Sequence, residues 1–79
     1  MTKPAKEIKI GDTVRTWAYW IVVKEITESF QKNGKRLINV SGDRVFNSKS
    51  EKNILVKQCG EQILEAFEEF KENTKVSYK

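Results

Sequence analysis

The sequence predicts a mainly β fold of about five strands with one C-terminal helix, at the margin of the α+β class. Three observations predict it. Short runs of β-branched and aromatic residues alternate with turn residues as far as Cys59. An Asn33-Gly34 pair, typical of a tight hairpin, separates two of these runs. After Gly60 the spacing of apolar residues changes from two residues to the helical period of about 3.6.

Length and composition bound the class of protein. The 79 residues fit one domain over residues 1–79 with a modest core. No apolar run is long enough to span a bilayer, and a single cysteine fits a reducing compartment, so we expect a cytoplasmic protein with no membrane partner. The chain has no histidine, the commonest general base and metal ligand, so we expect no enzymatic activity, no metal and no cofactor.

Residues 1–7 include Pro4 and several polar side chains, and we expect them to form a mobile arm. We expect the strands that follow to form a small barrel over residues 8–59. Turn residues and β-branched or aromatic runs predict short strands over residues 13–17, 20–32, 35–41, 44–47 and 54–56.

The Asn33-Gly34 pair also predicts a register. Both residues tolerate positive φ, as a two-residue type I′ turn requires. With this turn Phe30 faces Leu37, which is a favourable apolar pair across the two strands.

The same register places Lys32 opposite Lys35, where like charges repel. An anion bound between them would relieve the repulsion, so Lys32, Lys35 and Arg36 are candidate phosphate-binding residues. Arg44 is expected to extend this surface. The alternative is a solvated hairpin tip.

Apolar residues at positions i, i+1, i+4 and i+7 predict a helix over residues 61–73. We expect its apolar stripe to close the barrel. The alternative is a homodimer in which the stripe packs against its copy, because so short a chain offers little core for two phenylalanines. The stripe consists of Ile63, Leu64, Phe67 and Phe70.

Charge is distributed unevenly along the chain. Residues 1–60 contain 12 basic and 6 acidic side chains, a balance of +6, whereas residues 61–79 contain 3 and 5, a balance of −2, which together give the net +4. A basic body predicts an anionic partner, either nucleic acid or an acidic protein surface. Acids interleaved with the lysines are also typical of a solubilising surface.

A second group of candidate binding residues lies on the first predicted strand. If Val14 faces the core, Arg15, Trp17 and Tyr19 alternate with it and point outward. Aromatic rings beside a cation form the stacking platform that single-stranded nucleic acids use. The alternative is that Trp17 and Trp20 cover the open end of a small barrel or lie under the helix.

Three segments carry a resemblance to a known fold: residues 11–15 (GDTVR), 20–26 (WIVVKEI) and 39–42 (NVSG). The chain resembles SH3-like small barrels of the KOW and Tudor type, in which a GDxV opener precedes a strand with Val and Ile three residues apart. Val23 and Ile26 have that spacing. The resemblance covers roughly residues 8–59 and implies a five-stranded barrel.

Two functions follow from these patterns. The first is a small non-catalytic barrel that binds or associates with nucleic acid, with candidate residues Arg15, Trp17, Tyr19, Lys32, Lys35, Arg36 and Arg44. The alternative is a protein-binding adaptor or inhibitor, encoded by a phage or another mobile element.

Overall fold

The computed structural model describes residues 1–79. It confirms a mainly β fold with a single α-helix. In chain order the elements are β1 (Thr2–Pro4), the 3-10 helix η1 (Ala5–Glu7), β2 (Thr13–Arg15), β3 (Trp20–Phe30), β4 (Arg36–Val45), α1 (Lys49–Cys59), the 3-10 helix η2 (Glu61–Leu64), β5 (Glu65–Lys71) and β6 (Lys75–Ser77).

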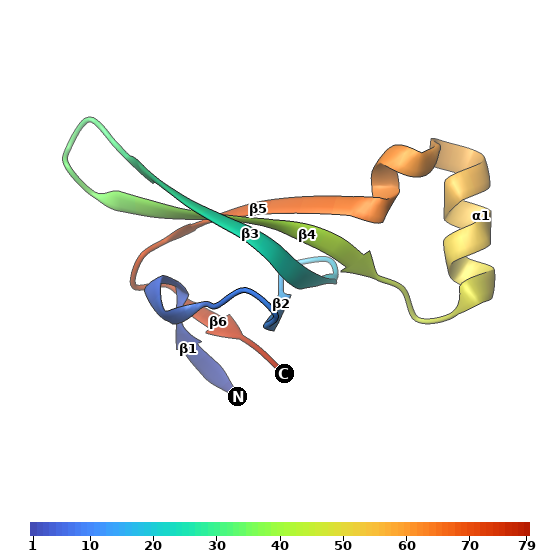
Figure 1. The fold of residues 1–79 in the computed structure, drawn as a ribbon, viewed down its shortest axis with the longest axis horizontal. Helices are drawn as coiled ribbons and strands as arrows, with labels where there is room; N and C mark the ends of the chain where they lie inside the picture. Colours follow the sequence, from blue (N-terminus) through green and yellow to red (C-terminus); the bar gives the residue numbers. More distant parts are fainter.

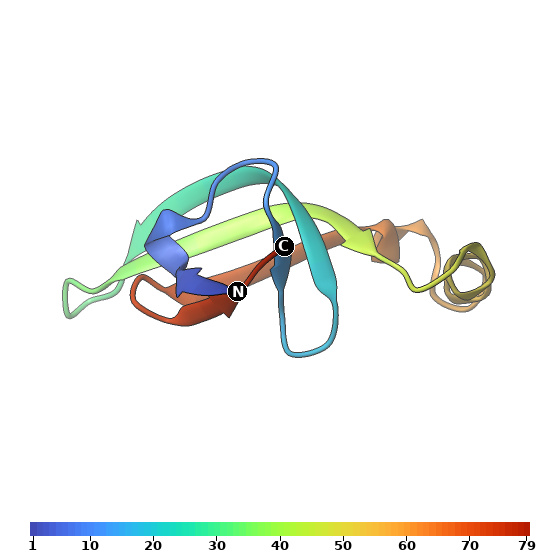
Figure 2. The ribbon, with the colours of Figure 1, turned by 90° about the horizontal axis from the view of Figure 1, so that it is seen from below.

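Four strands form one antiparallel sheet in the order β2-β3-β4-β5, and this sheet curls into a half-barrel (Figure 2). A second sheet pairs β1 with β6 (Figure 1). A bridge between Val14 and Tyr78 joins the two sheets. The chain termini therefore lie side by side next to β2 (Figures 1 and 2).

The core lies on the inner face of the curled sheet. Alternate side chains of β3, β4 and β5 point inward, as the two-residue period of a strand requires. The N-terminal segment and β6 cover them. The buried hydrophobic residues are Ala5, Ile8, Val14, Ile21, Val23, Ile38, Val40, Ala66 and Val76.

A β-bulge produces much of the curl. The register between β3 and β4 shifts between Val23 and Glu25, and a bulge bends the strand that carries it. Opposite the bulge, a Cβ atom at Gly42 would lie 1.9 Å from the carbonyl oxygen of Val22. Only glycine fits this close approach of two strands.

The expectation of a mobile arm over residues 1–7 is wrong. Ala5 is completely buried, and its N–H donates to the carbonyl of Thr74 at 2.9 Å. Lys3 Nζ lies 2.5 Å from Asp12 Oδ2, and the hydrogen bond from Lys3 lowers the pKa of that carboxyl. The arm is ordered because β1 pairs with β6, and no local sequence pattern predicts this long-range pairing.

The β3–β4 hairpin forms, but the predicted turn is wrong by one residue. Only glycines adopt positive φ in this chain, so Asn33 cannot occupy a type I′ turn. The N–H of Gly34 donates to the carbonyl of Gln31, and Gly34, at φ 81°, follows the turn as a bulge residue. Phe30 consequently faces Arg36, and the N–H of Gln31 donates to Lys35, so the predicted Lys32–Lys35 opposition does not exist.

The helix lies at Lys49–Cys59 rather than over residues 61–73. The hydroxyl of Ser48 caps it by accepting a hydrogen bond from the N–H of Glu51 at 3.1 Å. The predicted strand over residues 54–56 is part of this helix. The barrel strands extend beyond the predicted limit of residue 59, because residues 65–71 form β5 beside β4.

The predicted apolar stripe does not form. Phe67 lies on the outer face of β5 with 61% of its surface exposed, whereas Phe70 points inward and packs against the core. Ile63 and Leu64 lie in η2. These four residues share no helical face, so the structure offers no surface of the kind on which the homodimer was expected.

Helix α1 stands at one end of the molecule, at the opposite end from the β3–β4 turn (Figure 1). It buries none of its residues, and Ile54 is 55% exposed. With eleven residues it is too short to cross a membrane, and no other helix of the structure is long and apolar enough to do so.

Candidate functional site

The turn between β2 and β3 presents Trp17 to solvent. Thr16, only 5% exposed, fixes this turn: its hydroxyl accepts hydrogen bonds from the N–H groups of Ala18 and Tyr19 and donates to the Tyr19 carbonyl at 2.9 Å. Trp17 at the tip is 90% exposed, so it covers no core. Arg15, Trp17 and Tyr19 do not share one strand face, because β2 ends at Arg15 and Tyr19 packs against the core.

Beside this turn lies a hollow of about 440 Å³, which we call the Arg44 hollow. It forms where the β2–β3 turn, the end of β4, the first turn of α1 and the last residue of the chain meet. Its lining residues are Arg15, Ala18, Tyr19, Trp20, Arg44, Val45, Phe46, Asn47, Glu51 and Lys79.

Arg44 is half-buried between two aromatic rings. Its guanidinium carbon lies 4.6 Å from the ring centroid of Tyr19 and 5.2 Å from that of Phe46. Its Nε is shielded from solvent and has no hydrogen-bond partner within the chain. None of the four ion pairs of the structure includes Arg44. The charge is therefore held by aromatic faces alone.

Two further cations of the hollow lie on Trp20. Lys79 Nζ is 4.5 Å from a Trp20 ring centroid, and the guanidinium carbon of Arg15 is 5.8 Å away. Neither cation has a carboxylate partner. Glu51 is the one acidic side chain in the lining, and it also forms no ion pair. The hollow thus gathers three positive charges whose partners are rings.

The residues predicted at the hairpin tip lie elsewhere. Arg36 Nε is 3.2 Å from Glu72 Oε2, without the geometry of a hydrogen bond, and Arg36 Nη1 is 3.6 Å from Glu28 Oε1. Two carboxylates therefore neutralise Arg36. Lys32 and Lys35 are exposed. A polar hollow of about 330 Å³ beside Arg36 includes Lys35 but no aromatic residue.

The expectation that Arg44 extends the surface of the tip is wrong. Arg36 and Arg44 are eight residues apart on β4, which is about 27 Å at a rise of about 3.4 Å per residue. The buried residues Ile38 and Val40 lie between them on the same face of the strand. The two predicted clusters are separate surfaces.

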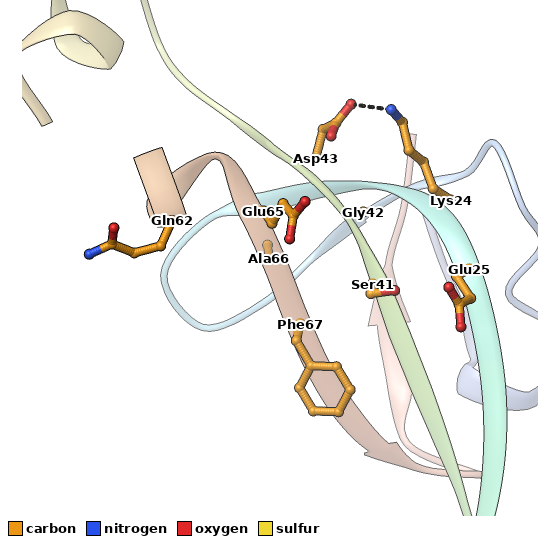
Figure 3. A pocket seen from close by; sticks show the side chains of 9 residues that line it. All are labelled: Lys24, Glu25, Ser41, Gly42, Asp43, Gln62, Glu65, Ala66 and Phe67. Atoms are coloured by element: carbon orange, nitrogen blue, oxygen red, sulfur yellow. Dashed lines mark ion pairs between the residues drawn. The ribbon is translucent and has the colours of Figure 1, made fainter. Parts of the chain in front are cut away.

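The largest hollow, of about 550 Å³, lies over β3, β4 and β5 and is acidic (Figure 3). Carboxylates of Glu25, Asp43 and Glu65 line it, and Phe67 stands at one end (Figure 3). Its single cation, Lys24, is 2.8 Å from Asp43 Oδ2, and this hydrogen bond raises the pKa of Lys24. The acidic side chains are not arranged as a metal-binding group. A polyanion would be repelled here.

Of the predicted binding residues, the structure brings together Arg15, Tyr19 and Arg44, with Trp17 on the adjoining turn. Sequence reasoning misses Phe46 and Lys79. Phe46 has a local signal, since it lies two residues after Arg44 and so on the same side of an extended chain. Lys79 has none, because it reaches the hollow only when its N–H pairs with the carbonyl of Thr13 beside β2.

Comparison with protein-family models, curated proteins and solved structures finds no match to this chain. No relative therefore supplies a ligand or a residue role. Any function assigned to the Arg44 hollow rests on the chemistry of the residues that line it.

Proposed function

We propose that this chain is a small non-catalytic protein that binds nucleic acid through the Arg44 hollow. The observation that carries the proposal is Arg44 itself, a half-buried cation between two rings with no carboxylate partner. A partly desolvated charge costs free energy unless an anion compensates it. A phosphate oxygen that accepts hydrogen bonds from the guanidinium supplies this compensation.

The surroundings of Arg44 favour nucleic acid among phosphate ligands. Arg15 and Lys79 add two cations without carboxylate partners, so several phosphates of one chain can be held together. Aromatic residues beside a cationic groove are the combination that nucleic-acid-binding proteins use for stacking. The net charge of +4 attracts a polyanion from a distance.

We also infer that the half-barrel is an SH3-like small barrel of the KOW or Tudor type. The last three residues of the GDTVR segment form β2, and the Val23–Ile26 spacing spans the bulge that bends β3. The exposed thiol of Cys59 suits a reducing compartment, so we place the protein in the cytoplasm.

Binding of labelled oligonucleotides tests the proposal. Fluorescence anisotropy at a series of salt concentrations should give binding that weakens steeply as salt increases, because bound phosphates release counterions. The logarithmic slope should fall by about 0.7–0.9 for each phosphate contact that is lost. If neither DNA nor RNA is bound at about 50 mM salt, the proposal is wrong.

A matched pair of variants locates the site. Arg44→Ala should weaken binding and reduce the salt slope by about 0.7–0.9, the value expected for the loss of one phosphate contact. Arg36→Ala removes the same charge from the same strand, but this arginine is already neutralised by Glu28 and Glu72, so affinity and slope should stay near the wild-type values. Equal affinity of Arg44→Ala and wild-type protein would remove the hollow from the interface.

The alternative function is that of a protein-binding adaptor or inhibitor, encoded by a phage or another mobile element. The acidic hollow favours it, since Glu65 and the exposed Phe67 would suit a basic partner with an apolar side chain (Figure 3). A pull-down from nuclease-treated lysate separates the two functions. Partners that survive nuclease and are lost with Glu65→Lys support the adaptor, and partners that disappear with the nucleic acid support the first proposal.

A further inference from the structure

We infer that the Arg44 hollow takes single-stranded rather than double-stranded nucleic acid, with Trp17 stacking on a base while the cations of the hollow hold the phosphates. This inference rests on the proposed function and adds the class of ligand and a division of roles between the aromatic residues. The observations behind it are the surroundings of four aromatic rings at the site, which belong to Trp17, Tyr19, Trp20 and Phe46.

Three of the four rings already have a cation on one face. Tyr19 and Phe46 share Arg44, and Trp20 carries Lys79 and Arg15. A base that stacked on those faces would have to displace the cation and lose its interaction with the ring. These rings therefore hold the cations in position, and the cations are the groups available to a phosphate.

Trp17 differs from the other three rings. It is 90% exposed, and no cation lies over it. Both faces of its indole are free for a base. Stacking on such a ring requires no sequence-specific hydrogen bond, because every base has an aromatic face.

The position of Trp17 is fixed even though its side chain is exposed. The three hydrogen bonds of the Thr16 hydroxyl pin the backbone on both sides of the turn tip. A turn held in this way presents the ring without a large loss of chain entropy on binding. The next two residues, Ala18 and Tyr19, line the hollow, so a strand with a phosphate in the hollow has a base near Trp17.

A duplex cannot use this arrangement without distortion. Its bases are stacked on one another, and unstacking a step to admit a ring costs free energy. The unpaired bases of a single strand are free to stack on an aromatic side chain. The combination of an unoccupied ring at a turn tip and phosphate-binding cations beside it therefore selects a single strand.

The test compares three ligands with wild-type protein and two variants. The ligands are a labelled single strand of about 12 nucleotides, its duplex, and an abasic strand of the same length. Wild-type protein should bind the single strand more tightly than the duplex. Trp17→Ala should lose about 5- to 150-fold in affinity for the base-bearing strand with an unchanged salt slope, and should bind the abasic strand like wild type. Trp17→Phe should restore most of the loss.

Three results would overturn the inference: equal affinity for single strand and duplex, no loss with Trp17→Ala, or the same loss on the abasic strand. In each of them wild-type protein still binds nucleic acid, so the proposed function stands. If wild-type protein binds none of the ligands, the proposed function fails and the inference fails with it. Because Trp17 is exposed, both variants should unfold at the urea concentration of the wild type.

Discussion

Two arginines on β4 illustrate how environment decides the role of a residue. Arg36 and Arg44 point to the same face of the strand, one at each end of the core. Glu28 and Glu72 neutralise Arg36, and we assign it to the stability of the hairpin and the β5–β6 turn. Arg44 has only rings beside it, and we assign it to ligand binding. From the sequence alone, both arginines are candidate binding residues.

The hydroxyl of Thr16 holds the β2–β3 turn through three hydrogen bonds. Thr16→Val keeps the shape of the side chain but leaves the N–H groups of Ala18 and Tyr19 without this acceptor. We expect the free energy of unfolding to fall by about 1–3 kcal/mol, because these two N–H groups lose their hydrogen-bond acceptor beside the buried Thr16 side chain. Urea unfolding measures the change.

Thr27→Val is the control for this substitution, since Thr27 is exposed on β3 and forms no side-chain hydrogen bond in the structure. It should leave stability nearly unchanged. Thr16→Val protein as stable as wild type would contradict the role of Thr16 in fixing the turn that carries Trp17.

At the scale of elements, local signals and tertiary pairing compete. Residues 65–71 contain three glutamates, one alanine and one lysine, which favour a helix, yet they form β5 because the whole segment pairs with β4. Residues 54–56 are Ile, Leu and Val and favour a strand, yet they lie in α1. A signal for α1 is present in the sequence: Ser48 followed three residues later by Glu51 matches the capping-box pattern.

Only part of the site follows from local sequence patterns. The β3–β4 hairpin and the outward position of Arg15 follow from local patterns. The grouping of Arg15, Tyr19 and Arg44 does not, since it depends on β3 pairing with β2 on one side and with the end of β4 on the other. The contribution of Lys79 depends on β6 lying between β1 and β2, which is a long-range pairing.

Because α1 buries no residue, we expect it to open independently of the half-barrel. Ser48→Ala removes the N-cap and should cost the helix about 0.5–2 kcal/mol. Hydrogen exchange should then become faster at the amides of α1 and stay unchanged at those of β3 and β4. A loss of the same size in the global free energy of unfolding would contradict this independence.

The whole molecule separates its charges in space. Its dimensions are 42 × 27 × 19 Å, with the hairpin tip at one end and α1 at the other (Figure 1). The Arg44 hollow contains three cations and one acid, whereas the hollow over the outer face of the sheet contains three carboxylates and one paired lysine. A polyanion drawn by the net charge of +4 is therefore directed toward one surface and away from the other.

An NMR titration shows whether nucleic acid binds at the Arg44 hollow and not elsewhere. Nitrogen-15-labelled protein is titrated with a short single strand, and amide signals are followed residue by residue. We expect shifts over residues 15–20, over residues 44–47 and at Lys79, with residues 32–36 and 65–67 unchanged. Shifts concentrated at the hairpin tip or over the acidic hollow, or no shifts at all, would contradict binding at the Arg44 hollow.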